Sequence, residues 1–310
     1  MGQQLDDELS MYKRMEKSSK RCQGHHYVRT LLDSFEIDRA STRHLCLVHP
    51  PLWESVWAFL HRNPIGRLPP PVLAGVLRSL FLALDYLHTE YISAGNIMIG
   101  IEDDSVFGEF EEREIQDPGP RKVVDSDGRT IYLSQDLRIP KQIGHPVLCD
   151  FGSAVPGDME HLEDIQPNHY RAPEVILGVP WTYSVDIWNV GCMIWDIFEG
   201  GPLFTGHDPE FKKYRSRAHL ADMINLLGPP PTGLLREGKD SSRFFTEKYE
   251  FRAQDLLKNH VPLEERETTL EGQDKVEFLR LMWRMLQWEP EKRSSAKELA
   301  EDRWLYKHLH

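Results

Sequence analysis

The chain of 310 residues lacks several features that would assign its class at once. It has only four cysteines (Cys22, Cys46, Cys149 and Cys192), and none stands in a C-x-x-C pair, so neither a disulfide framework nor a zinc site is expected. It also has no excess of positive charge. A net charge of −12 argues against nucleic acid as the main partner, because phosphate backbones attract basic surfaces.

Targeting segments are also missing from the sequence. The first residues, "MGQQLDDELSMYK", have neither the basic start nor the apolar core of a signal peptide, and no unbroken apolar run approaches the length of a membrane span. We therefore expect an intracellular protein, cytoplasmic or nuclear, with reduced thiols and no membrane partner. Its 40% hydrophobic and 28% charged residues are typical of a soluble globular chain.

The order of periodic segments predicts an α+β fold with a little sheet first and helices after. A long apolar pattern over 73–87 predicts the main buried helix, and Pro69 to Pro71 stand at its start. The polar and acidic stretch 102–145 is expected to be a solvated loop inserted between two strands. Two early strands are predicted at 27–37 and 44–50, and a further one in "PVLCDFG". Other helices are predicted around 5–12 and over 183–198, 218–227, 276–286 and 294–305.

Three short motifs resemble the parts of a phosphoryl-transfer site, which needs divalent metal held against phosphates and a carboxylate near the attacking hydroxyl. Asp150 ends a strand in "LCDFGSA", so its carboxylate would emerge on a turn. Asn96 stands next to a strand in "AGNIMIG", and its amide oxygen suits Mg²⁺. The tripeptide Ala172-Pro173-Glu174 follows the D-F-G by 22 residues. Their order and spacing together indicate one machinery.

On these motifs the chain resembles the eukaryotic protein kinase family, and within it the CMGC group and fungal relatives of the SR-protein kinases. The resemblance implies that Asn96 and Asp150 hold Mg²⁺, with Gly152 completing the D-F-G turn. It also implies that Asp186 braces the catalytic loop and that Arg293 pairs with Glu174. Leu52 would offer its amide to the adenine of ATP, and His49 would stand at the gatekeeper position.

The resemblance divides the chain into a partial N-lobe, residues 1–51, and a C-lobe, residues 52–310, which carries the acidic insertion. The fold expected is thus protein-kinase-like, with a mostly complete helical C-lobe and an incomplete N-lobe sheet. Glu8 resembles the helix Glu that pairs with a phosphate-gripping Lys in the family. However, no G-x-G-x-x-G and no V-A-I-K-like strand occur in the 310 residues.

The catalytic loop also departs from the family. Counting five places back from Asn96 puts Tyr91 where the family has its catalytic Asp. A phenol stays protonated at neutral pH and cannot replace a carboxylate as the acceptor of the substrate proton. The sequence therefore offers no secure catalytic base.

Three functional hypotheses follow. The first is a serine/threonine protein kinase that uses ATP and Mg²⁺ and acts on basic or Arg/Ser-rich proteins, as the resemblance implies. The second is a catalytically dead kinase fold that serves as a binding or scaffold module. The third is an incomplete gene prediction of an active kinase, because both gaps remove functional segments while the flanking motifs stay intact.

Overall fold

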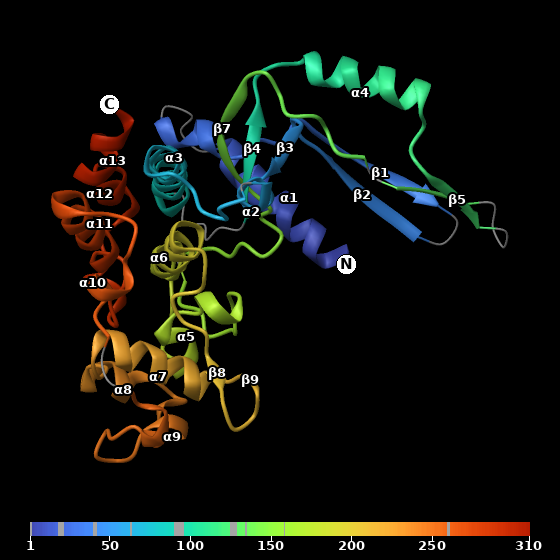
Figure 1. Cartoon of the computed structure of the whole chain (residues 1–310). Helices are drawn as coiled ribbons and strands as arrows, with labels where there is room; N and C mark the ends of the chain where they lie inside the picture. Colours follow the sequence, from blue (N-terminus) through green and yellow to red (C-terminus); the bar gives the residue numbers. More distant parts are fainter. Residues whose placement is uncertain are drawn as a thin grey trace.

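The computed structural model describes most of the chain, namely residues 2–17, 22–39, 42–62, 64–89, 96–124, 129–133, 135–157, 159–258 and 261–310. Most strands gather at one end of the molecule, and helices form the rest (Figure 1). This arrangement confirms the predicted α+β class. Tyr91 lies outside the described residues.

The N-terminal part differs from the prediction at its first strand. Helix α1 spans Gly2–Lys17, and a 3-10 helix, η1, covers Gln23–Tyr27, so its last residue is the first residue of the strand predicted at 27–37. The strands β1 (Asp33–Arg39) and β2 (Thr42–Val48) form an antiparallel hairpin that projects from the body (Figure 1). The predicted strand starts too early, because Tyr27 ends η1 and Val28 forms only an isolated bridge with Leu148.

A three-stranded sheet positions the site. It contains β3 (Leu52–Ser55), β4 (Asn96–Ile101) and β7 (Ile143–Cys149), with β4 in the middle and antiparallel to both neighbours. The predicted boundary between residues 51 and 52 falls at the start of β3, and the division into two domains stays a prediction.

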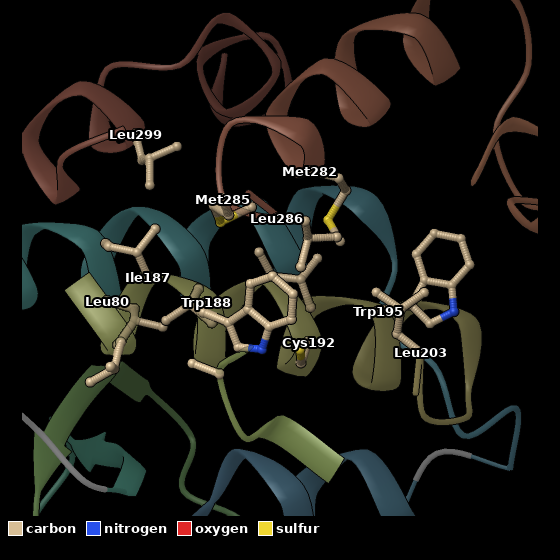
Figure 2. Close-up of a cluster of buried hydrophobic side chains, with 14 of the residues drawn as sticks. Leu80, Ile187, Trp188, Cys192, Trp195, Leu203, Met282, Met285, Leu286 and Leu299 are labelled. Atoms are coloured by element: carbon tan, nitrogen blue, oxygen red, sulfur yellow. The ribbon is translucent and has the colours of Figure 1, made fainter. Parts of the chain in front are cut away.

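The core is built around helix α3, which spans Pro70–Thr89 and contains the predicted apolar pattern. Helix α6 (Ser184–Glu199) and helix α11 (Gly272–Trp283) pack near it. Figure 2 shows apolar side chains of these helices and the turns after them meeting in one layer, among them Leu80, Trp188, Met282, Met285 and Leu286. Each fully buried large side chain of this kind stabilises the fold by about 1.5–3 kcal/mol.

By length and composition alone, α3 could cross a membrane, although Arg78 and Asp85 interrupt its apolar residues. Its apolar residues are instead buried by other parts of the protein: Leu73, Leu77 and Phe81 have no exposed surface. Within the described residues, α3 is thus the core helix of a globular fold.

The acidic stretch 102–145 is not the solvated loop that its composition indicated. It contains helix α4 (Ser105–Gln116) and the hairpin of β5 (Arg121–Val124) and β6 (Arg129–Tyr132). Val106 is buried and anchors α4, while the Asp103 carboxylate accepts bonds from the Ser105 amide and hydroxyl at its start. The acidic side chains lie on a helix surface, so a low hydrophobic content did not mean an absence of structure.

The C-terminal helices pack along α3 (Figure 1). The predicted helix 294–305 is two helices, α12 (Ala296–Ala300) and α13 (Arg303–Leu309), because Asp302 caps the second one and pairs with Arg284 at 2.6 Å.

The remaining elements are α2 (Val56–Arg62), η2 (Asn168–Tyr170), α5 (Pro173–Leu177), β8 (His207–Asp208), β9 (Lys213–Tyr214), α7 (Ser216–Leu227), α8 (Thr232–Glu237), α9 (Ser241–Phe244), η3 (Gln254–Leu256), α10 (Leu263–Arg266) and η4 (Pro290–Lys292).

Candidate catalytic cleft

The strand register brings the two predicted metal-binding positions to one end of the sheet. Asn96 of β4 is the partner of Cys149 of β7, and Asp150 follows Cys149 directly. Adjacent strands lie about 5 Å apart, so the backbones of Asn96 and Asp150 are neighbours. Asp150 is exposed and has a left-handed backbone with φ 66°, a conformation that costs a non-glycine residue about 1–3 kcal/mol. Such strain is often found at functional sites.

Leu52 lies toward the other end of the same sheet. It is in register with Gly100, four residues along β4 from Asn96. A rise of about 3.3 Å per residue separates the two positions by ~13 Å along the strand.

The D-F-G turn is attached to helix α1 through aromatic rings. Phe151 is fully buried, and its ring meets Tyr12 edge-on, with 5.4 Å between ring centroids. Tyr12 also contacts His49, whose burial lowers the pKa of its imidazole. Glu8 lies one helical turn before Tyr12 on the same face of α1 and is half-buried. Gly152 continues the turn after Phe151.

A cleft of about 1120 Å³ opens beside Asp150. Its described lining comes from the ends of β4 and β7, from α2, from the segment 164–167 and from α6. Four carboxylates line it, and no Lys or Arg is among the lining residues that the structure describes; the four are Asp150, Asp164, Asp186 and Asp196. The described part of the cleft therefore favours positively charged ligands.

An exposed aromatic residue stands on the same cleft. Trp57 of α2 leaves 66% of its surface in solvent, and its ring lies against that of His61 at a tilt of 35°, with 3.9 Å between ring centroids. Indole faces attract guanidinium and ammonium groups. Trp57 is therefore available to a cationic side chain entering the acidic cleft.

Asp186 braces the end of α3. It is buried at the first turn of α6, and its Oδ2 lies 3.1 Å from Nε2 of His88. The ring of His88 also packs on Tyr183, with 4.7 Å between centroids. Residues 90–95, which follow α3, are outside the described part of the chain, and the role of Asp186 toward them stays a prediction.

The segment before Ala172-Pro173-Glu174 is held by Gln166, a residue that the sequence did not single out. Gln166 has a left-handed backbone with φ 70°. Its side-chain Nε2 donates to the Val185 carbonyl, and its Oε1 accepts from the Ala172 amide, both at 2.8 Å. Arg171 donates to the Gln166 carbonyl at 3.2 Å. A left-handed glutamine has no sequence signature, because its conformation is set by these tertiary contacts.

Tyr170 and Asp196 meet on the wall of the cleft. The Tyr170 hydroxyl donates to Oδ2 of Asp196 at 2.5 Å. Burial, together with this neighbouring carboxylate, raises the pKa of Tyr170, so the phenol keeps its proton at neutral pH. Asp196 therefore accepts this hydrogen bond beside the cleft.

Glu174 and Arg293 form a buried ion pair behind the cleft. Two hydrogen bonds of 2.6 and 2.7 Å join the guanidinium to the two carboxylate oxygens. Arg293 also donates to the Ser184 carbonyl and lies over the ring of Trp188. Through these bonds Arg293 links α5 to the start of α6. The start of α6 in turn holds Gln166, which donates to the Val185 carbonyl.

Comparisons with known proteins agree with this geometry. A sequence model of the protein kinase domain matches residues 139–305. A serine/threonine protein kinase of Aspergillus fumigatus is 40% identical over 306 residues, which cover 97% of this chain and 75% of that protein. The serine/threonine-protein kinase SRPK of Physarum polycephalum is 26% identical, covering 87% of this chain and 69% of the relative.

More distant relatives have the same fold. The dual specificity protein kinase CLK1 of Mus musculus is 25% identical over 268 residues, covering 85% of this chain and 50% of the relative. The crystal structure of a kinase domain, PF14_0431, superposes with a TM-score of 0.70 at 21% identity. That alignment covers 98% of this chain and 84% of the other, and it confirms the predicted kinase-like fold.

Proposed function

The chain belongs to the protein kinase family, among relatives of the serine/threonine kinases SRPK and CLK, and from this premise we propose that its cleft holds a magnesium nucleotide beside a basic protein segment. The observation that carries the proposal is the cleft itself. Asp150 stands at the edge of the cleft next to Asn96. The other charged residues in the described lining of the cleft are also carboxylates. A basic Ser/Thr-containing substrate, such as an Arg/Ser-rich protein, has the complementary charge.

The residues at the sheet end are suited to magnesium. Mg²⁺ prefers oxygen ligands and usually takes one or two from the protein, with phosphates and water supplying the others. Asp150 and Asn96 offer a carboxylate and an amide. The described residues contain no group of three or more His, Cys, Asp or Glu that could hold a metal ion alone. The ion would neutralise charge on the nucleotide phosphates. Leu52 would bind adenine at the opposite end of the sheet.

Transfer of the phosphoryl group is expected to be slow with these 310 residues. The sequence has Tyr91 instead of a carboxylate at the base position, and loss of a general base typically lowers the rate by ~10²–10⁴-fold. We therefore propose that the chain binds nucleotide and basic protein with little turnover.

Nucleotide binding can be tested by thermal denaturation with and without ATP and Mg²⁺. The wild-type protein should be stabilised by the pair of ligands, and Asp150→Ala should lose most of that stabilisation, because binding to the folded state raises its stability. Asp117→Ala, an exposed carboxylate after α4 and outside the cleft, is the matched control and should respond like the wild type. Equal responses of all three proteins would refute the metal role of Asp150.

A second candidate is an active protein kinase. It is favoured by the contacts that support the loop and the following segment, His88 with Asp186 and Arg293 with Glu174. ATP-dependent phosphorylation of an Arg/Ser-rich peptide distinguishes the two candidates. Turnover that Asp150→Ala abolishes would establish the active kinase, whereas peptide binding without turnover would support the binding module.

A further inference from the structure

The segment that forms one wall of the acidic cleft has a single buried anchor. Between Gly157 and Ala172, His161 is the only buried residue that the structure describes, and the others are half-buried or exposed. Residues 164–167 of this segment line the cleft, whereas His161 is not among the lining residues. A segment with so few buried side chains depends on specific contacts to keep one conformation.

His161 is attached to Trp181, which lies in the turn between α5 and α6. Their backbones form two hydrogen bonds: the His161 amide donates to the Trp181 carbonyl at 3.1 Å, and the Trp181 amide donates to the His161 carbonyl at 2.9 Å. Their rings stack with 4.8 Å between centroids and 28° between planes. Ring pairs at such distances attract each other beyond the effect of burial. The two residues are therefore joined through backbone and side chain.

Each of the two rings also donates a hydrogen bond to the backbone of the segment. Nε2 of His161 lies 2.6 Å from the Pro156 carbonyl oxygen, and it carries the proton because a carbonyl only accepts. Nε1 of Trp181 donates to the Glu163 carbonyl at 3.0 Å. Pro156 and Glu163 stand on either side of His161 in the sequence, so the two bonds fix the segment before and after its anchor.

Trp181 connects this anchor to the cleft. It is only 2% exposed, and it lines the cleft together with residues 164–167. The bond to Glu163 ends directly before Asp164, whose carboxylate lies 3.1 Å from Nε of Arg171. The wall is thus held at its start by His161 and Trp181, and at its end by the contacts of Arg171 and Gln166.

We infer that His161 is a positioning residue for the basic protein segment that the cleft binds, an inference that rests on the proposed function. Through Trp181 it keeps the wall 164–167 in the conformation that accepts the ligand. Without this anchor only a fraction of the molecules has the wall in place, and the apparent affinity falls by that fraction. The magnesium end of the cleft does not depend on the anchor, because the register of β4 and β7 places Asn96 beside Asp150.

The test is the affinity of the full chain for an Arg/Ser-rich peptide, measured by fluorescence anisotropy. His161→Ala removes the ring and the donor, so it should weaken peptide binding by about tenfold. His161→Gln keeps a side-chain donor for the Pro156 carbonyl and should recover part of the affinity. His169→Ala is the matched control: it removes an exposed histidine of the same segment, outside the cleft lining, and should bind like the wild type.

The response to nucleotide separates positioning from a general loss of stability. Thermal stabilisation by ATP and Mg²⁺ should be equal in the wild type, His161→Ala and His169→Ala. If His161→Ala loses both the peptide and the nucleotide response, the residue only supports the fold and the inference is wrong. Equal peptide affinity of His161→Ala and the wild type would overturn it as well.

Hydrogen exchange of the free protein tests the anchor without any ligand. The amides at positions 161 and 181 donate to each other's carbonyls, so both should exchange faster in His161→Ala, and to a smaller extent in His161→Gln. His161→Gln supplies the comparison if His161→Ala does not fold. A wild type that binds no peptide would refute the proposed function, and exchange would still decide on the anchor. Unchanged exchange at both amides in a folded variant would show that the side chain of His161 does not hold the wall.

Discussion

Glu174 and Arg293 form two parallel hydrogen bonds, at 2.6 and 2.7 Å, between side chains that lie 119 residues apart and are almost completely buried. The fork of a guanidinium matches the two oxygens of a carboxylate, so both partners are satisfied at once. The pair joins α5 to the turn between η4 and α12.

Removing one partner of this pair should strongly destabilise the fold. Arg293→Met leaves a buried, unpaired carboxylate, and such changes typically cost about 3–5 kcal/mol. Chemical denaturation of the variant and the wild type measures the difference. Arg243→Met is the control, because Arg243 and Asp240 form a surface pair whose loss should cost at most about 1 kcal/mol. Similar costs for both variants would contradict a structural role of the buried pair.

Gly24 should not tolerate a side chain. A Cβ at this position would collide with the carbonyl oxygen of Leu82 and lie 2.8 Å from the Cβ of Tyr86. Gly24→Ala must push η1 away from α3, and overpacking of this kind costs about 1–3 kcal/mol. Gly233→Ala is the matched control in helix α8, where a Cβ meets nothing within 4 Å and should stabilise the helix by up to about 1 kcal/mol. Thermal denaturation should shift in opposite directions for the two variants.

His219 should make the fold sensitive to acid. Burial lowers the pKa of its imidazole from 6.5 to about 3, with a further lowering from the nearby His169 and Arg171. Between these two pH values the unfolded chain binds a proton that the folded chain does not. The free energy of unfolding should therefore fall as pH drops below about 6.5, by at most about 1.4 kcal/mol per pH unit for this group.

The variant His219→Phe isolates that contribution. Phenylalanine keeps an aromatic ring against Phe204 and Tyr214 but cannot bind a proton. The difference in unfolding free energy between variant and wild type should shift in favour of the variant from pH 7 to pH 5. His207→Gln, at an exposed position, should follow the wild type. A constant difference across that range would show that His219 does not titrate on unfolding.

Trp57 should contribute to the binding of basic peptides, if the cleft acts as proposed. Trp57→Ala removes an aromatic face next to the acidic cleft, and a cation–π contact of about 0.5–2 kcal/mol corresponds to a several-fold to roughly thirtyfold change in affinity. Fluorescence anisotropy with an Arg/Ser-rich peptide measures it. Trp57→Phe should retain part of the affinity. An unchanged dissociation constant for Trp57→Ala would exclude this contact.

Long helices of the C-terminal body such as α3, α6, α7 and α11 could be predicted from the sequence because their signals are local. The apolar spacing that marks α3 is a property of that segment alone, and the order of Asn96, Asp150 and Glu174 identified the family. The segment 102–145 was misread because a surface helix such as α4 buries little more than Val106 and so has a weak apolar pattern. The strand predicted at 27–37 begins only at Asp33, because Tyr27 belongs to η1 and Val28 pairs with the distant Leu148 instead.

The sequence by itself determined which residues can do chemistry and in what order they follow one another. It determined that a carboxylate follows one predicted strand, that an amide stands next to another, and that position 91 has a phenol. Only the tertiary structure decided what each of these groups faces. Contacts between distant segments set the left-handed backbone of Gln166 and the acidic lining of the cleft. They also bury the donors of Tyr12 and Arg29 that have no partner in the described residues. Such contacts are set by packing, which a local pattern does not encode.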